Sequence, residues 1–250
     1  MIKVIDISKS FGEKKVLDKA RLTINDGETF LIIGRSGAGK TVLLRSIIGL
    51  IKPDSGKILI DNEDITYLDK SRLNKIRKKI GVVFQGNALF DFLTVEENVG
   101  FMFYQHSNLS REVIREKVRE TLELVGMRDI EDLYPYELSG GMKKRVAVAR
   151  AIIYHPKVVI YDEPTTGVDP IAVDKIASLI EDLHRKLSTT SIIVTHDLHV
   201  GLKLADRLAF LLGGKIIFEG SQEELKNLKD ERIIQFMKGS SEGPIKETEV

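Results

Sequence analysis

The chain has 250 residues, of which 42% are hydrophobic and 30% charged, enough for one large domain or two small ones with a buried core. Its 38 Lys and Arg balance 37 Asp and Glu, so no bulk field draws it to nucleic acid or to an anionic membrane, and a bound anion must be held locally. The absence of cysteine excludes disulfides, thiolate metal sites and a cysteine nucleophile.

Membrane insertion and export are not expected. No apolar stretch approaches the roughly 18 to 20 residues that cross a bilayer. Residues 1–7 interrupt their apolar positions with charges and lack a small-residue cleavage site, which indicates a strand and not a signal peptide.

The first ninety residues predict strands separated by turns, with one helix among them. The helix begins near Lys40 after a glycine-rich turn, is apolar on most sides and ends before Pro53. The predicted strands are 3–7, 21–24, 29–33, 57–60 and 80–84.

From residue 93 to about 138 the pattern becomes helical. Residues 94–97 have capping-box spacing, and Ser110 precedes a helix with one apolar stripe that Gly126 would close. Strand and helix then alternate again, with Asp169-Pro170 opening one helix and Gly213-Gly214 joining a hairpin. The later elements are expected at 158–162, 191–195, 208–212, 215–219 and 222–238.

The fold class is therefore α/β, with one domain over 1–238. Its core covers 1–90 and 156–220, a helical subdomain at about 91–155 interrupts it, and a C-terminal helix follows at about 222–238. Residues 239–250 have linker composition, and we expect a flexible tail. Ligands of such sheets bind beyond the carboxyl ends of the strands.

A phosphate-binding loop follows the strand 29–33. The motif G-x-x-x-x-G-K-T stands there at a strand-to-helix junction. Its glycines let several backbone N–H groups converge on phosphate, the helix start adds partial positive charge, Lys40 adds a full charge, and Thr41 can ligate Mg²⁺. The alternative is an ordinary glycine-rich turn. The predicted nucleotide-binding residues are Gly34, Arg35, Ser36, Gly37, Ala38, Gly39, Lys40 and Thr41.

Two carboxylates end the apolar strand 158–162. Asp162 is the candidate metal ligand, and Glu163, one residue later, is the candidate base that accepts a proton from the attacking water. Taken alone, both could equally be exposed loop carboxylates before Pro164.

A second helix start suited to an anion follows Leu138. Ser139 is a good N-cap, and Gly140 and Gly141 leave the first-turn amides uncovered. The basic residues at 143–145 place several positive charges close together near this helix start. This arrangement lowers stability unless an anion lies nearby. For this segment alone, a capped helix with a solvated basic face is the favoured alternative.

These motifs, in this order and over nearly the whole chain, resemble the ATPase subunits of ABC transporters. The resemblance implies a P-loop NTPase fold of the ABC type, with a small antiparallel β subdomain and an inserted helical subdomain, and a Mg²⁺-dependent ATPase. It makes 138–142 the signature, with Ser139, Gly140, Gly141 and Met142 binding nucleotide. It also implies that Gln85, beside Thr41 and Asp162, contacts the metal.

Four further positions match the family's pattern: Gln85, Asp169, His196 and Phe11. The resemblance implies that Phe11 stacks on adenine with Val16 beside it, that Asp169 contacts the second protomer, and that His196 hydrogen-bonds the γ-phosphate. Each has a structural alternative. Phe11 could be a core aromatic, Gln85 a polar strand end, Asp169 a plain N-cap and His196 a structural histidine.

A departure from the commonest signature narrows the resemblance to one subgroup of the family. Met142 stands where Gln is usual, and a basic run follows, as in a subgroup similar to the Mla/Mce-associated phospholipid-transport ATPases. Residues 235–239 and 243–245 match that subgroup as well. The likeness implies a homodimer whose signatures complete the sites in trans, a separate permease docking near 85–92, and an MCE-type lipid-binding partner. It implies a peripheral place on the cytoplasmic face of the inner membrane.

Two other classes of function remain as alternatives: a soluble ABC-type ATPase acting on DNA, ribosomes or a scaffold, and a binding module without catalysis. The segment between Thr41 and Ser139 has no sustained heptads for a coiled coil, and one cassette is present. The presence of Glu163 and His196, the candidate catalytic residues, argues against a binding module that has lost its catalytic activity. An ABC ATPase for another substrate also stays open.

Overall fold

The computed structural model describes residues 1–245, apart from the side chains of residues 170 and 171. Two compact units make up the chain: Met1–Asn74 together with the chain from Ile192 onward, and Lys75–Ser191. The expected helical subdomain at about 91–155 lies inside the second unit, and its bounds stay a prediction.

An antiparallel four-stranded sheet forms part of the first unit. Its strands are β1 (Ile2–Phe11), β2 (Lys14–Ile24), β4 (Ser55–Ile60) and β5 (Glu63–Asp64), in the order β2-β1-β4-β5. Ile2 pairs with Ile24 on one side and with Ile60 on the other, and these three side chains are buried. The alternating apolar residues of these strands therefore face a core, which confirms the expected antiparallel subdomain.

The phosphate-loop strand belongs to a second strand layer of the same unit. The fully buried β3 (Thr29–Ile33) runs parallel to β9 (Arg207–Leu212), and β9 forms an antiparallel hairpin with β10 (Lys215–Ser221). Lys215 pairs with Leu212, so the hairpin predicted through Gly213-Gly214 is confirmed.

Helices cover β3. The first, α1 (Lys40–Ile47), follows it, and α7 (Leu198–Leu204) packs on it so closely that a Cβ at Gly201 would lie 2.9 Å from the Leu31 side chain.

The C-terminal part of the first unit departs from expectation. The helical stretch expected at 222–238 is two helices, α8 (Gln222–Lys226) and α9 (Glu231–Lys238), and the Phe236 ring meets Phe210 edge-on at 4.7 Å. Residues 239–245 fold back on α9 instead of forming the flexible tail that their composition predicts. The Gln235 amide donates to the Ile245 carbonyl and accepts from the Ile245 N–H, and Ile245 is buried. Residues 246–250 of the expected tail lie outside the described residues.

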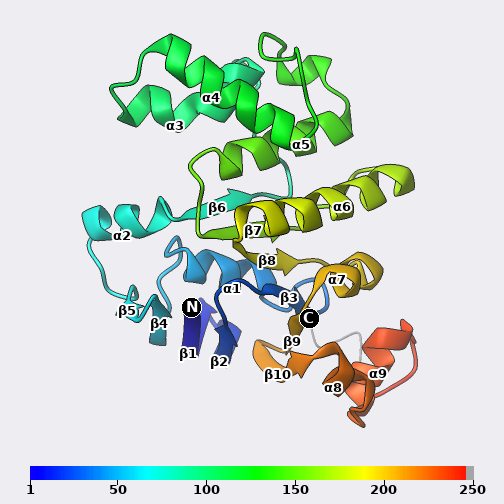
Figure 1. Ribbon diagram of the computed structural model, residues 1–250. Helices are drawn as coiled ribbons and strands as arrows, with labels where there is room; N and C mark the ends of the chain where they lie inside the picture. Colours follow the sequence, from blue (N-terminus) through cyan, green and yellow to red (C-terminus); the bar gives the residue numbers. More distant parts are fainter. Residues whose placement is uncertain (246–250) are drawn as a thin grey trace. The chain divides into compact units, whose positions relative to one another are not determined.

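The second unit pairs two parallel strands with a group of helices. Strand β6 (Ile80–Val83) runs parallel to β7 (Val158–Asp162). Helices α3 (Val95–His106) and α4 (Arg111–Leu124) lie side by side, with α5 (Gly140–Ile152) packed against both (Figure 1). A 3₁₀ turn η1 (Pro135–Glu137) precedes α5, and α6 (Pro170–Leu187) follows β7.

Local sequence signals fixed most of these helix starts. Thr94 and Glu97 form the predicted capping box, and the Ser110 and Ser139 hydroxyls cap α4 and α5. Helix α2 (Lys70–Arg77) was not predicted, because Ile76 is its buried residue and it carries no apolar stripe. The final strand, β8 (Thr190–Val194), spans the boundary between the units.

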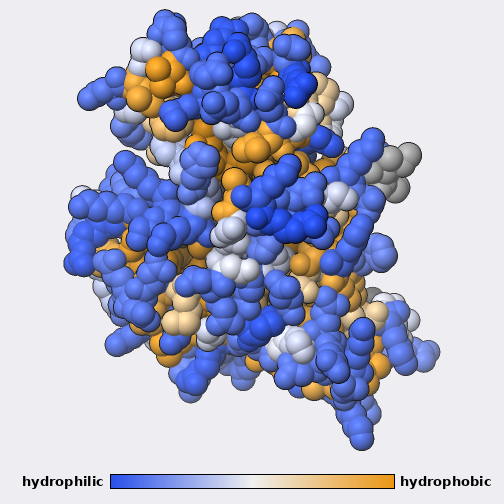
Figure 2. Space-filling view, in the orientation of Figure 1, coloured by the Kyte–Doolittle hydropathy of each residue, from blue (hydrophilic) through white to orange (hydrophobic). Residues whose placement is uncertain are grey.

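Hydrophilic side chains cover most of the face seen in Figure 2, with smaller apolar patches between them. Within residues 1–245, no helix combines the length and apolar character that crossing a membrane requires.

Candidate nucleotide-binding and catalytic site

The phosphate loop sits where β3 ends and α1 begins, as the motif predicts. Gly37 and Gly39 have φ of 81° and 102°, in the region that favours glycine. A Cβ at Gly34 would lie 2.3 Å from the Leu211 carbonyl oxygen, and one at Gly39 would lie 2.8 Å from the Val16 carbonyl oxygen. Two glycines of the motif are therefore required by the packing of the loop against β9 and β2, before any ligand is considered.

The ammonium of Lys40 is held over this loop. Its Nζ donates to the carbonyl oxygens of Gly34 at 2.7 Å and Arg35 at 3.0 Å, and the residue is buried. The neighbouring Ser36 and Thr41 are exposed, as a phosphate-binding and metal-binding role would need. The loop thus brings together glycine amides, one fixed cation and the N-terminus of α1.

The first unit brings Val16 to the phosphate loop, and Phe11 lies elsewhere on the same hairpin. Val16 packs on Gly39, since its Cγ1 would be 3.3 Å from a Cβ there. Phe11, at the end of β1, is 50% exposed, with the Lys9 ammonium 5.5 Å from its ring centroid. This exposure removes the alternative that Phe11 is a core aromatic.

His196 occupies an exposed bend between β8 and α7. The residues on either side are fixed: the Thr195 hydroxyl accepts from the Asp197 N–H at 3.0 Å, and the Asp197 carboxylate caps α7 by accepting from Val200. The backbone of the bend is therefore held by these hydrogen bonds, while the His196 side chain is exposed.

The second unit brings Gln85, Asp162 and Glu163 to the same sheet edge. Val83 pairs with Tyr161 in the parallel β6–β7 ladder, so the residues that follow both strands emerge together at their carboxyl ends. Gln85 is exposed and Asp162 is partly buried. The alternative of two exposed loop carboxylates is removed for Glu163, which is 9% exposed.

The backbone at Glu163 is unusual. Its φ is 51°, a left-handed conformation that costs free energy for a residue other than glycine. The Thr166 N–H donates to the Glu163 carbonyl at 3.3 Å, and the Thr166 hydroxyl donates to Oε2 at 3.5 Å. Backbone strain of this kind is concentrated at functional sites, where the fold holds a side chain in an otherwise unfavourable position.

The signature start and the loop before Asp169 also meet. The Ser139 hydroxyl accepts from the Met142 N–H at 3.3 Å, and Asp169 accepts from the Ala172 N–H at 3.0 Å, so the N-cap alternative holds for Asp169. A Cβ at Gly140 would lie 3.8 Å from the Gly167 carbonyl oxygen, an ordinary contact distance. Packing therefore does not require glycine at 140.

The basic run after the signature is not a solvated face. Lys144 is 1% exposed, and its Nζ donates to the Gln85 carbonyl at 3.2 Å. Burial lowers the pKa of Lys144, and the nearby Asp162 charge partly opposes that shift. Arg145 donates to the Val125 carbonyl at 2.8 Å. The expectation that these positive charges need a nearby anion is therefore wrong for Lys144 and Arg145, because both side chains donate to main-chain oxygens of the protein.

Sequence reasoning also missed the role of Arg150. Its guanidinium donates to the carbonyls of Ala88 at 2.6 Å and Asn87 at 2.8 Å, across a wide separation in the chain. Nothing in the local spacing signals these contacts, since they depend on how α5 packs on the segment after β6.

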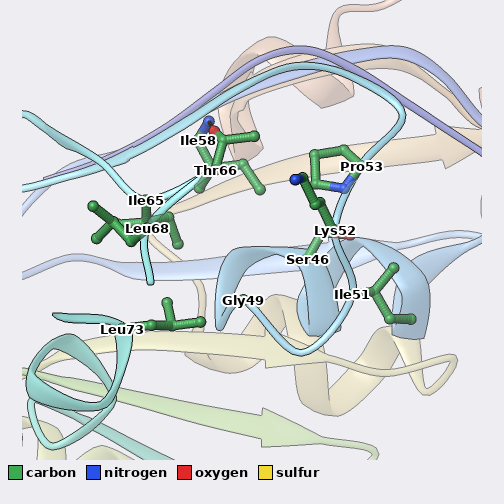
Figure 3. Close-up of a pocket in the computed structure, with 10 residues that line it drawn as sticks. All are labelled: Ser46, Gly49, Ile51, Lys52, Pro53, Ile58, Ile65, Thr66, Leu68 and Leu73. Atoms are coloured by element: carbon green, nitrogen blue, oxygen red, sulfur yellow. Dashed lines mark hydrogen bonds between the residues drawn. The ribbon is translucent and has the colours of Figure 1, made fainter. Parts of the chain in front are cut away.

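A cavity of about 160 Å³ in the first unit lies apart from the predicted site residues. It is bounded by the end of α1, the following loop, β4, the segment before α2 and Leu73 of α2 itself (Figure 3). The Ile58 N–H donates to the Thr66 hydroxyl at 2.9 Å in its wall. Its lining residues are Ser46, Gly49, Ile51, Lys52, Pro53, Ile58, Ile65, Thr66, Leu68 and Leu73.

Comparisons with known proteins show the family to which the chain belongs. The chain is 41% identical to the intermembrane phospholipid transport system ATP-binding protein MlaF of Haemophilus influenzae, over 98% of this chain and 93% of that protein. It is 36% identical to the probable ribonucleotide transport ATP-binding protein mkl of Mycobacterium tuberculosis, over 98% of this chain and 68% of that protein. The solved ATP-binding cassette MJ0796, a dimer in a post-hydrolysis state bound to ADP and Pi, superposes with a TM-score of 0.80 at 34% identity, covering 88% of this chain and 98% of that chain.

The family model described as ABC transporter matches residues 17–166, from β2 through the signature and both carboxylates. With the phosphate loop, the signature helix and the strand-end carboxylates in the family's order, the chain belongs to the ABC transporter family as an ATP-binding cassette.

Proposed function

We propose that this chain is the ATP-hydrolysing subunit of a transporter that moves phospholipid between membranes, working as a homodimer on a separate membrane permease. The observation that carries this proposal is the full-length similarity to a phospholipid transport ATP-binding protein, which extends over 98% of the chain. A likeness confined to the family's motifs would support only an ATPase.

ATP binding is proposed to use the phosphate loop and the β1–β2 hairpin. The loop residues 34–41 would hold the phosphates through backbone amides and the Lys40 charge. The exposed Phe11 ring would stack on adenine, with Val16 beside the loop.

The donor set fits a magnesium ion. A Thr41 hydroxyl, a Gln85 amide oxygen and an Asp162 carboxylate are the hard oxygen ligands that Mg²⁺ prefers. When bound, the ion would neutralise charge on the transferring phosphoryl group.

Glu163 is proposed to be the base. It would accept the proton of the attacking water while the water oxygen bonds to the γ-phosphorus and the bond to the bridging oxygen of ADP breaks. Its left-handed backbone and burial hold the carboxylate in one place. His196 would donate a hydrogen bond to the γ-phosphate from its exposed bend.

The signature is proposed to act in trans. Two copies related by a two-fold axis would each place residues 139–142 against the nucleotide of the other, with Asp169 at the protomer contact. The solved relative that binds ADP and Pi is dimeric, which supports this arrangement. Burial of nucleotide between protomers makes ATP stabilise the dimer and hydrolysis weaken it.

The permease is proposed to dock on the segment after β6. Phe92 is 76% exposed, and the Phe90 ring makes tilted contacts with the rings of Phe92 and Phe101, at centroid distances of 5.8 and 4.9 Å. An exposed aromatic cluster of this kind suits an apolar helix of a partner protein. The chain would then be peripheral, on the cytoplasmic face of the inner membrane, and an MCE-type protein would receive or supply the lipid.

A second candidate is an ABC ATPase for another substrate. The relative named for probable ribonucleotide transport covers the same 98% of the chain, which favours this reading of the substrate while leaving the ATPase unchanged. A soluble ATPase acting on nucleic acid has no comparable observation in its favour.

One experiment tests the proposal. The tagged chain with Glu163→Gln is purified from detergent-extracted membranes with ATP and Mg²⁺, and the bound proteins and lipids are identified. A polytopic permease that carries phospholipid, together with phospholipid-stimulated ATPase of the wild-type complex, supports it. A permease whose ATPase responds to ribonucleotides and not to phospholipid favours the second candidate, and a soluble nucleic-acid complex contradicts transport.

A further inference from the structure

The segment that follows β6 has a backbone that cannot be stable on its own. Asn87 and Ala88 are consecutive left-handed residues, with φ of 61° and 53°, and neither is glycine. Oδ1 of Asn87 is buried and accepts no hydrogen bond from any residue in the described part of the chain. Both features cost free energy, so contacts from elsewhere must hold the segment in this conformation.

Those contacts come from α5. Lys144 donates to the Gln85 carbonyl at 3.2 Å, and Arg150, six residues further along the helix, donates to the carbonyls of Asn87 and Ala88 at 2.8 and 2.6 Å. Three main-chain oxygens of one short segment are thus held by two cations of one helix. We call Lys144, Arg150 and the carbonyls that they hold the α5 clamp.

The two cations are placed at a cost to the fold. Lys144 is 1% exposed, and burial lowers the pKa of both side chains. Cations that leave water usually lie against carboxylates, whereas the guanidinium of the partly buried Arg150 donates to neutral carbonyls. A structural role alone would be served by apolar side chains of similar volume.

The clamp ties the segment to the signature helix. Helix α5 begins immediately after Ser139, and its far end is pressed on β6, where a Cβ at Gly81 would lie 2.2 Å from the Ala151 carbonyl oxygen. On the other side, the Asn98 side chain of α3 donates to the carbonyl of Phe90 and accepts from its N–H. The residues from Gln85 to Phe90 are therefore held from two helices and cannot shift without α5.

We infer that Lys144 and Arg150 are positioning residues that keep the strained segment 85–88 attached to the signature helix, so that displacement of the docking aromatics moves the signature. This inference rests on the proposed docking of a permease at Phe90 and Phe92. The strain at Asn87 and Ala88 makes the attachment reversible, because the segment has a relaxed alternative once the clamp opens.

Arg150→Met is the decisive variant, since the Arg150 guanidinium donates to the carbonyls of Asn87 and Ala88. Arg145→Met is the matched control, because Arg145 is also a cation of α5 that donates to a main-chain carbonyl, at Val125. Ala88→Gly supplies a rescue, since glycine adopts a φ near 53° without strain. Lys144→Arg and Lys144→Met compare a retained with a lost cation at the second position.

Two readouts are made on the whole chain. Hydrogen exchange of the peptide 84–92 is followed in the purified ATPase, and ATPase activity is measured with and without the co-purified permease in phospholipid nanodiscs. Arg150→Met is expected to lose protection of this peptide and to lower permease stimulation about fivefold or more, with basal activity retained. Arg145→Met should change neither, Ala88→Gly should restore both in the Arg150→Met background, and Lys144→Arg should retain more stimulation than Lys144→Met.

Unchanged exchange in Arg150→Met, full permease stimulation in that variant, or equal effects of Arg145→Met each overturn the inference. If the wild-type chain is stimulated by no permease, the proposed function fails instead. The exchange comparison then decides the clamp by itself, and failure of Ala88→Gly to restore protection overturns it.

Discussion

Gly140, at the first position of the signature helix, faces the carbonyl oxygen of Gly167 across a gap that would accept a methyl group, since a Cβ there would lie 3.8 Å away. At Gly141 the nearest atom would be Cβ of Ala172 at 4.0 Å. Neither residue has a left-handed φ. The fold therefore tolerates a side chain at both positions, and the proposed approach of a ligand to the helix amides would explain the two glycines.

Gly141→Ala is accordingly expected to separate stability from activity. Alanine favours the helix, so the free energy of unfolding should stay equal or rise by up to about 1 kcal/mol. The added methyl group should obstruct phosphate at the helix start and lower ATPase about 100-fold, as loss of an electrostatic donor does. Urea unfolding and steady-state ATPase measure the two effects.

Gly39→Ala is the contrasting variant. Its Cβ would lie 2.8 Å from the Val16 carbonyl, at a φ of 102°, so unfolding free energy should fall by roughly 1–3 kcal/mol. Equal loss of stability in both alanine variants would contradict the distinction between the two glycine pairs.

Glu163→Gln should bind ATP and fail to turn it over. The amide has the same shape and can still meet the Thr166 hydroxyl, but it cannot accept the proton of water. Single-turnover hydrolysis should fall at least about 100-fold, while light scattering with ATP and Mg²⁺ shows a stable dimer. Ordinary turnover would remove Glu163 from the role of base, and a monomer at saturating ATP would contradict the shared site.

Lys40→Met should weaken nucleotide binding. The variant removes the charge that the carbonyls of Gly34 and Arg35 hold over the loop, so the Kd for ATP should rise roughly 10- to 100-fold. Equilibrium binding of a fluorescent ATP analogue measures it. Lys52→Met is the control: its Nζ lies 4.5 Å from the Tyr67 ring centroid, outside the phosphate loop, and an equal loss there would indicate a nonspecific charge effect.

Gln235→Ala should release the C-terminal segment. The buried N–H and carbonyl of Ile245 lose their partner, which lowers unfolding free energy by about 1–3 kcal/mol and exposes residues 239–245 to protease. Gln222→Ala removes a comparable pair of bonds, to Leu202 and Ala205, and should leave this cleavage unchanged. Resistance of the Gln235→Ala segment to protease would show that other contacts hold it.

Several features of the fold and of the site could be predicted from the sequence, because they depend on residues that are neighbours in the chain. The phosphate loop, the caps at Thr94, Ser110 and Ser139, and the hairpin at Gly213-Gly214 each rest on side chains or φ preferences within a few positions. Chain order alone then placed Asp162 and Glu163 at a strand end, where the structure has them.

The C-terminal segment shows the limit of composition. Gly, Ser and Pro at 239–244 predict a flexible linker, yet Gln235 closes on Ile245, with Gly243 fitting so tightly that a Cβ there would lie 2.4 Å from the Gln235 side chain. One buried amide that satisfies both backbone groups of Ile245 outweighs the local preference for disorder.

By itself the sequence determined which family the chain resembles, and it predicted a glycine-rich loop for the phosphates of ATP and two strand-end carboxylates for the site. Only the tertiary structure decided where the basic residues after the signature point, why Gly34 and Gly39 must be glycine, and how α5 holds Asn87 and Ala88 in left-handed conformations. The physical reason is distance along the chain. Caps and turns are satisfied by near neighbours, whereas a buried cation takes whichever carbonyl the packing of distant elements brings to it.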